Sequence, residues 1–195
     1  MKKLVIISFM MLFFSVNLFS QTGNWDIDLS HYKVGFSVSH MVISDVEGRF
    51  TEFTASAVTK KDGSLEKIEA TINIKSVNTD NQKRDDHLRS DDFFASEKYP
   101  EMKFVSKSIQ NKGGNKFKIT GDLTIRNVTK SVVLDAQLNG TVKDPWGNTR
   151  MGWKASTKIN RFDYGLNWNS LLEAGGLVVG KEVTINLEAE FMLKK

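Results

Sequence analysis

The sequence predicts an all-β protein, and three observations indicate that class. Val, Ile, Thr and Phe recur at alternating positions over most of the 195 residues, as they do in strands with one buried face. The chain has only two prolines, and clusters of Gly, Asn and Asp divide the alternating segments as turns do. Eight or nine such strands must either pair as two sheets or close on themselves. The length suits one domain, at most two.

In the first half of the chain the alternation defines four strands. The longest, 46–59, is predicted as one strand in which Gly48 allows a bend, and the polar run 60–64 then turns the chain. These strands and their apolar rows are 24–28, 33–40 (Val34, Phe36, Val38), 46–59 and 66–76 (Ile68, Ala70, Ile72, Ile74).

The pattern breaks in two places. Residues 80–96 are charged and lack β-branched side chains, which predicts a short helix with a loop after the fourth strand. Residues 162–181 are aromatic and Gly-rich, with a helical turn expected around 170–174.

In the second half, turns are predicted at 111–115, which holds a Gly-Gly pair, and at 144–148. One face of each strand is apolar and the other polar, as in an antiparallel sheet with a single buried face. The strands are 101–109 (Met102, Phe104), 116–126 (Phe117, Ile119, Gly121, Leu123, Ile125), 131–142 (Val132, Leu134, Ala136, Leu138), 150–161 (Met151, Trp153, Ala155, Thr157, Ile159) and 182–193 (Val183, Ile185, Leu187, Ala189, Phe191).

The first twenty residues have the layout of a secretory signal peptide. Lys2 and Lys3 precede a nearly continuous apolar run, and cleavage is expected near Ser20. The run is shorter than the roughly 20 residues that span a bilayer. We therefore expect residues 1–20 to be removed, the domain to cover 24–194, and the protein to be periplasmic or secreted without a stable membrane anchor.

Composition limits the function classes. The chain has no cysteine, which excludes disulfides and a lipidated cysteine anchor. Without Lys2 and Lys3 the formal charge falls from +4 to +2, and both signs are interleaved. That balance gives no indication of nucleic-acid binding.

An up-and-down strand order would put the short turns at one end and every long segment at the other. At that second end three apolar rows finish in polar residues: His40, Asn127 and Arg161. The sequence thus predicts an apolar interior with a polar mouth. A lipid with a polar head suits this arrangement, because its chain gains about 25 cal/mol per Å² of apolar surface buried while the head is hydrogen-bonded at the rim.

Each of these residues also has a structural interpretation. His40 could be a satisfied core histidine, and Arg161 could form an ion pair with Asp163 or with a carboxylate of the insertion. The three histidines lack metal-ligand spacing, so no metal site is predicted. The chain has neither a cysteine nor a Gly-x-Ser-x-Gly elbow, so no motif indicates nucleophilic catalysis.

Several short motifs, in this order and spacing, resemble the YceI-like family of bacterial envelope proteins over 25–193. Asn127 departs from the pattern, because a Gly is common at that position. The motifs are Trp25–Asp28 with His31, Val34–Met41, Val46–Phe50, Arg84–Ser90 with Asp92–Phe94, Tyr99–Pro100 with Phe104, Gly121–Arg126 with Val128–Lys130, and Arg161–Gly165.

The resemblance implies a lipocalin-like, extended antiparallel β-barrel of about eight strands that holds a polyisoprenoid such as a prenyl diphosphate or a quinone. It implies no enzymatic activity and no cofactor other than that lipid. The expected cavity residues are Phe36, Val38, Ile72, Phe93, Phe104, Leu123, Ile125, Trp153 and Ile159, and those of the mouth are His40, Arg84, His87, Asn127 and Arg161.

Two other functions stay open from the sequence. One is an enzyme acting on a bound lipid head group through His40, His87 and Arg161, which requires these side chains to converge. The other is a protein-binding module with a filled barrel. A homodimer through a strand edge or a tryptophan-bearing loop is a further alternative. The expected purpose of holding the lipid is its transport, its storage or protection against stress.

Overall fold

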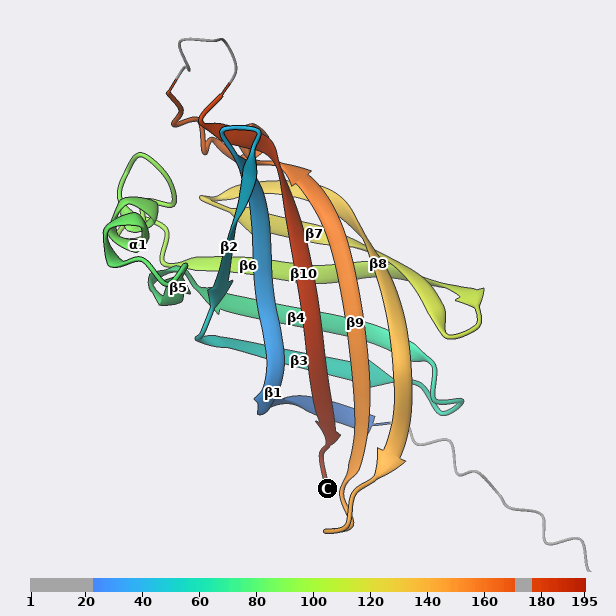
Figure 1. Ribbon diagram of the computed structural model, residues 1–195. Coiled ribbons are helices and arrows are strands. Elements are labelled where there is room, and N and C mark those ends of the chain that lie inside the picture. Colours follow the sequence, from blue (N-terminus) through green and yellow to red (C-terminus); the bar gives the residue numbers. More distant parts are fainter. Residues whose placement is uncertain (1–22, 171–176) are drawn as a thin grey trace, which may run out of the picture.

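The computed structural model describes residues 23–170 and 177–195, and Figure 1 shows long strands curving around a common interior with one helical insertion at the side. The expected leader 1–20 and most of the expected turn at 170–174 lie outside the described residues. The elements are β1 (Gly23–His40), β2 (Ser44–Phe50), β3 (Phe53–Thr59), β4 (Leu65–Asn73), η1 (Ile74–Ser76), β5 (Val77–Asn78), α1 (Gln82–Arg89), β6 (Glu101–Gly113), β7 (Lys116–Ile125), β8 (Val128–Lys143), β9 (Thr149–Asn160), η2 (Arg161–Tyr164) and β10 (Val179–Leu193).

The strands form a closed antiparallel barrel, as predicted. Their order is β10-β9-β8-β7-β6-β4-β3-β1, and β10 pairs with β1 to complete a ring of eight. The short strands β2 and β5 extend the wall beside β1. Closure removes the unpaired edges that an open sheet of this length would expose.

Three predictions of strand boundaries are wrong. The predicted strand 66–76 ends at Asn73, and Ile74–Ser76 form the short helix η1 instead. Segments 24–28 and 33–40 belong to one strand, β1, because a bulge between Ile27 and Tyr32 absorbs the residues that break the alternation. Segment 46–59 is two strands, interrupted at Thr51 and Glu52 rather than bent at Gly48.

The wall beside β1 changes partner along its length. β1 pairs with β3 over Gly23–Asp26 and with β2 over Gly35–His40, so the ladder on this side is interrupted between those ranges. Tyr32 bridges the interruption. Its hydroxyl donates to the Thr51 carbonyl at 2.9 Å, and its ring lies 4.6 Å from that of Phe53.

The up-and-down order places the two kinds of connection at opposite ends, as expected. The turns after β3, β6 and β8 lie at one end, which we call the short-turn end. The β1–β2 hairpin, the α1 insertion and the long β9–β10 connection lie at the other, the long-loop end (Figure 1).

The insertion is fixed to the barrel by polar contacts. The Asn81 side chain caps α1 by accepting from the Arg84 amide at 3.1 Å. Asp85 is buried and accepts from both the amide and the hydroxyl of Thr79. Arg89 donates to the carbonyls of Lys75 and Val77, in addition to pairing with Asp86. No helix of the described residues is long and apolar enough to cross a membrane.

Gly121 allows a close approach of two strands. A Cβ at this position would lie 2.5 Å from the Phe104 ring and 2.6 Å from the Val105 carbonyl oxygen. Gly121 therefore opens no space for a cavity, because the Phe104 ring occupies that space.

Gly121→Ala is expected to lower the free energy of unfolding by about 1–3 kcal/mol, the usual cost of overpacking a well-packed interior. Urea denaturation of the variant tests this. Because the Val105 oxygen belongs to the backbone, Phe104→Leu should restore only part of the loss. Full stability of Gly121→Ala alone would contradict the packing described.

A charged network ties together the short-turn end. Asp144 begins the β8–β9 turn and accepts from Arg150 Nε at 2.8 Å and from the amides of Asn148 and Trp146. Arg150 also donates to Asp28, in the bulge of β1. Arg150 and the hydrogen bonds of the turn lower the pKa of Asp144 to about 2, and His31, the Ser30 amide and Arg150 hold the pKa of Asp28 far below its usual range.

This network predicts acid-dependent stability. A carboxyl whose pKa is lower in the folded state stabilises that state above its unfolded pKa, near 3.8 for Asp144, and the contribution disappears as the pH falls toward about 2. Asp144→Asn should lower the melting temperature at neutral pH and reduce the further loss between about pH 5 and pH 2. A pH profile parallel to that of the unmodified protein would contradict this role.

Candidate functional site

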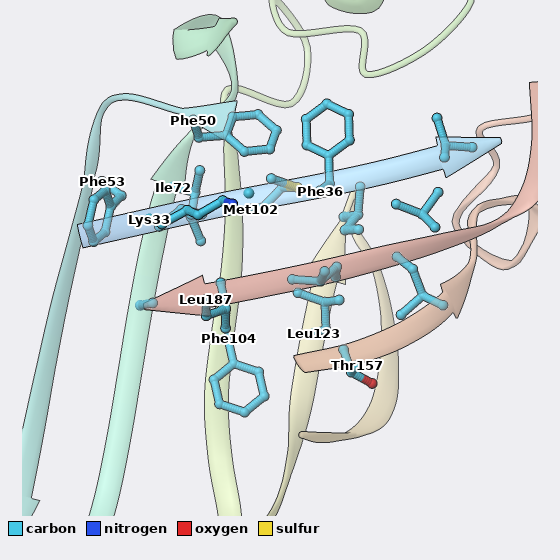
Figure 2. A pocket seen from close by; sticks show the side chains of 18 of the residues that line it. Lys33, Phe36, Phe50, Phe53, Ile72, Met102, Phe104, Leu123, Thr157 and Leu187 are labelled. Carbon is cyan, nitrogen blue, oxygen red and sulfur yellow. The ribbon is translucent and has the colours of Figure 1, made fainter. Parts of the chain in front are cut away.

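The barrel encloses a cavity of about 420 Å³. Figure 2 shows side chains from several strands converging on it, with Phe36, Phe50 and Leu187 among them. This volume lies within the range of natural small-molecule sites, which are about 300–1,000 Å³. The interior is therefore not a filled core.

The structure places all nine predicted cavity residues in the lining of this space. They come from five strands and from the loop after α1, which explains why no local motif reveals them. They are Phe36, Val38, Ile72, Phe93, Phe104, Leu123, Ile125, Trp153 and Ile159.

An aromatic group closes the cavity beneath the insertion. The ring of Phe50 lies 5.8 Å from that of Phe36 and 5.9 Å from that of Phe94. On the same insertion, Phe93 lies 5.2 Å from Trp168 of the β9–β10 connection. These contacts make α1 and its loop part of the cavity wall.

Gly48 determines how Phe36 sits. The two residues are cross-strand partners, and a Cβ on Gly48 would lie 2.3 Å from the end of the Phe36 ring and 2.8 Å from Thr79 Cγ2. The glycine thus lets the Phe36 ring pack closely against the backbone of β2. A larger residue here would displace the ring.

Arg161 lines the long-loop end of the cavity but is only 3% exposed. Its guanidinium donates to four backbone carbonyls, two in the β9–β10 connection and two at the start of β10, and burial lowers its pKa. Within the described residues it forms neither of the ion pairs considered from the sequence, with Asp163 or with a carboxylate of the insertion. The acceptors are Leu166, Trp168 at 2.9 Å, Val179 at 3.1 Å and Gly180 at 2.8 Å.

Four of the five N–H donors of Arg161 are therefore used within the chain. This arginine therefore acts as a structural clamp: its hydrogen bonds fix the conformation of the β9–β10 connection over the cavity. Only one N–H group is left that could donate to a ligand head group.

Arg84 and His87 project from α1 to the same end of the cavity. Arg84 uses Nε and Nη2 on the hydroxyl and carbonyl of Thr79, both at 2.7 Å. His87 Nε2 lies 2.9 Å from Asp92, and the imidazole ring makes T-shaped contacts with the rings of Phe93 and Trp168. The Nη1 group of Arg84 makes no hydrogen bond to the described residues.

His40, the last residue of β1, also lines this end. Its imidazole makes no hydrogen bond or ion pair with any residue in the described ranges, so the interpretation as a satisfied core histidine does not apply. Nor do His40, His87 and Arg161 hydrogen-bond to one another there.

Asn127 is the one predicted mouth residue that does not line the cavity. Arg126 and Asn127 both have positive φ, at 50° and 58°, and form a two-residue turn between the paired residues Ile125 and Val128. Asn and Gly favour that turn conformation. The turn ends the apolar row and leaves Asn127 exposed, so its prediction as a mouth residue is wrong.

Sequence reasoning missed several lining residues. Lys33 and Thr157 add polar groups to the lining and are labelled in Figure 2. Phe94 and Trp168 stand in segments without strand alternation, where only their aromatic character signals burial, and Phe50 lies in the predicted strand 46–59, to which no apolar row was assigned. Further missed residues are Ile27, Val46, Leu88, Leu166, Val178 and Val179.

One group of potential metal ligands, Asp28, His31 and Glu190, occurs among the described residues at the short-turn end. The Arg150 guanidinium already contacts Asp28 and lies 3.5 Å from Glu190. A fixed cation of the protein thus neutralises these carboxylates, and they form part of the stabilising network.

The model of the YceI-like domain matches residues 25–191. A UPF0312 protein of Staphylococcus aureus strain MSSA476 is 36% identical over 174 residues, 88% of this chain and 99% of that protein. A UPF0312 protein of Photorhabdus laumondii is 44% identical over 145 residues, 73% of this chain and 75% of that protein.

Solved structures show the same fold. The Campylobacter jejuni YceI protein superposes with a TM-score of 0.70 at 36% identity, covering 80% of this chain and 90% of that one. A polyisoprenoid binding domain from Saccharophagus degradans superposes with a TM-score of 0.61 at 16% identity, covering 89% of this chain and 100% of that one, which is a likeness of fold alone. The family match, the relatives and the closed barrel agree: this chain belongs to the YceI-like domain family.

Proposed function

We propose that this protein is an exported carrier that holds the chain of a polyisoprenoid lipid in its barrel. The observation that carries the proposal is the cavity of about 420 Å³, walled by Val, Leu, Ile and aromatic side chains from most of the barrel strands. Burying a lipid chain there gains about 25 cal/mol per Å² of apolar surface. The fold it shares with a polyisoprenoid binding domain supports the ligand class.

The polar groups at the long-loop end support a ligand with a polar head. His40 and Arg84 both line the cavity there and both retain polar atoms without a hydrogen bond to the described residues. A guanidinium N–H and an imidazole can donate to phosphate or quinone oxygens. A prenyl diphosphate or a quinone with its head at these residues and its chain toward Trp153 satisfies both ends.

A filled protein-binding barrel is disfavoured by the cavity itself. An enzyme using His40, His87 and Arg161 gains no support from their contacts, because Arg161 is committed to backbone carbonyls and His87 to Asp92. We therefore propose binding without catalysis. Residence in the periplasm or medium, and transport or storage of the lipid, follow from the expected leader and the carrier role.

Titration of the protein with geranylgeraniol and with geranylgeranyl diphosphate tests this proposal. Trp153 and Trp168 line the cavity, so a bound chain should change their emission. We expect both lipids to bind, and Arg84→Met to weaken the diphosphate more than the alcohol. If neither lipid altered the emission or displaced a fluorescent apolar probe, the carrier proposal would be wrong.

A further inference from the structure

The β1–β2 hairpin ends in an exposed apolar tip, formed by Met41, Val42 and Ile43. Val42 and Ile43 are 79% and 80% exposed, and Met41 is 37% exposed. Single exposed apolar residues are ordinary on protein surfaces, but three in succession at the end of a hairpin are not.

The backbone of the tip is strained. Met41 and Val42 have φ values of 52° and 64°, in the left-handed region that favours Gly or Asn. A β-branched residue such as Val42 is especially unfavourable there. Val42 thus occupies a strained backbone conformation although its exposed side chain contributes nothing to the core. This combination indicates a role at the surface.

The tip stands beside the long-loop end of the cavity. The residue before it, His40, lines the cavity, and the Met41 amide donates at 2.9 Å to the carbonyl of Val178, another lining residue. A second bond, from the Ile43 amide to the His40 carbonyl at 3.2 Å, holds the tip to the end of β1. Anything that binds the tip is therefore brought to the cavity.

We propose that this tip docks on a lipid bilayer, inserting Val42 and Ile43 among the headgroups so that the long-loop end of the cavity faces the membrane. This inference rests on the proposed lipid-carrier function, because a polyisoprenoid is nearly insoluble in water and has to be taken from or delivered to a bilayer. Three side chains are too small a patch for a protein interface, which takes about 800 Å² per partner. They suffice for shallow, reversible insertion at a membrane interface.

Because the chain has no cysteine, one introduced cysteine can carry an environment-sensitive fluorophore at a chosen site. The mature protein is purified from the cells that produce it, and its N-terminus is established by measuring its intact mass. The fluorophore is then attached to the cysteine of the Val42→Cys or the Trp146→Cys variant. Trp146 is the matched control, since it is 78% exposed in the β8–β9 turn at the short-turn end. On adding phosphatidylcholine vesicles, we expect a blue shift from position 42 and none from position 146.

A shift at position 146 without one at 42, equal shifts at both, or no shift at either would overturn the proposal. A shift at 42 produced only by a protein fraction of the envelope, and not by vesicles, would also overturn it and assign the tip to a protein partner.

Two variants separate docking from folding and from ligand binding. Val42→Asp with Ile43→Asp should lower vesicle affinity at least about tenfold, since each buried apolar group contributes to interfacial binding. The same protein should bind geranylgeraniol added in detergent as before. Loss of that binding too would show failure of the carrier function, whereas unchanged vesicle affinity would refute docking alone.

Val42→Gly relieves the strain and removes the side chain. We expect its melting temperature to rise while its vesicle affinity falls. A purely structural tip would show no fall in vesicle affinity.

Discussion

Ala155→Phe is expected to lower the affinity for a prenyl chain by at least about 100-fold, because the ring would occupy space that the lipid uses. Ala155 lies at the centre of β9, faces the cavity, and is paired with Ala136 and Leu187 of the neighbouring strands. Excluding four or five methylene groups of the lipid forfeits roughly 3–4 kcal/mol at about 0.8 kcal/mol each, which corresponds to two to three orders of magnitude in affinity.

The matched control is Lys154→Phe, one residue earlier on the same strand. Lys154 is exposed and its 3.5 Å ion pair with Glu188 is a surface interaction of small energetic value. We expect the Lys154→Phe protein to bind geranylgeraniol and geranylgeranyl diphosphate with unchanged affinity. Unaltered affinity of a folded Ala155→Phe protein would show that the lipid binds somewhere other than the barrel interior.

Arg161→Met is expected to lower the free energy of unfolding by about 3–5 kcal/mol, because it leaves several buried carbonyls without donors. Two of the carbonyl acceptors lie in the β9–β10 connection and two at the start of β10, so the connection should lose its attachment to that strand. Urea denaturation measures the loss, and increased protease cleavage within that connection would locate it.

A second arginine at the same end provides the comparison. Arg126 donates to one carbonyl, that of Gly165, and stacks on the Tyr99 ring, so Arg126→Met should cost only about 1–2 kcal/mol. If Arg161 served a ligand head group instead, Arg161→Met would weaken diphosphate binding and leave stability intact. That result would contradict the clamp.

The strands were predictable because alternation is local. The rows through Phe36, Leu123 and Trp153 require only that successive side chains point to opposite faces, and the barrel puts all of those rows around one cavity. The strand order followed from the assumption that neighbours in sequence pair, which holds around the ring apart from the short strands β2 and β5, since these pair with each other outside it.

The predictions that were wrong concern features that depend on partners distant in sequence or on turn geometry. The carbonyls that bind Arg161 are brought to it by the course of a loop, which no spacing reveals. The bulge in β1 is stabilised from outside, by Arg150 reaching Asp28 across 122 positions of sequence. Asn127 could have been assigned correctly, because an Asn between two paired strands is a typical turn residue.

Gly121 illustrates a different limit. A small residue in an inward row is compatible with a void or with a neighbour's ring, and only the position of Phe104 decides between them. The same ambiguity affects Gly48, where the glycine accommodates Phe36 rather than a bend.

The most direct test of the central claim is native mass spectrometry of the protein purified from its own host, followed by organic extraction of the purified material. We expect an added mass that matches an isoprenoid recovered in the extract, and we expect that mass to be absent from the Ala155→Phe protein purified in the same way. A protein that carries no added mass, and gains none after incubation with prenyl lipids, would contradict the claim that this barrel holds a lipid.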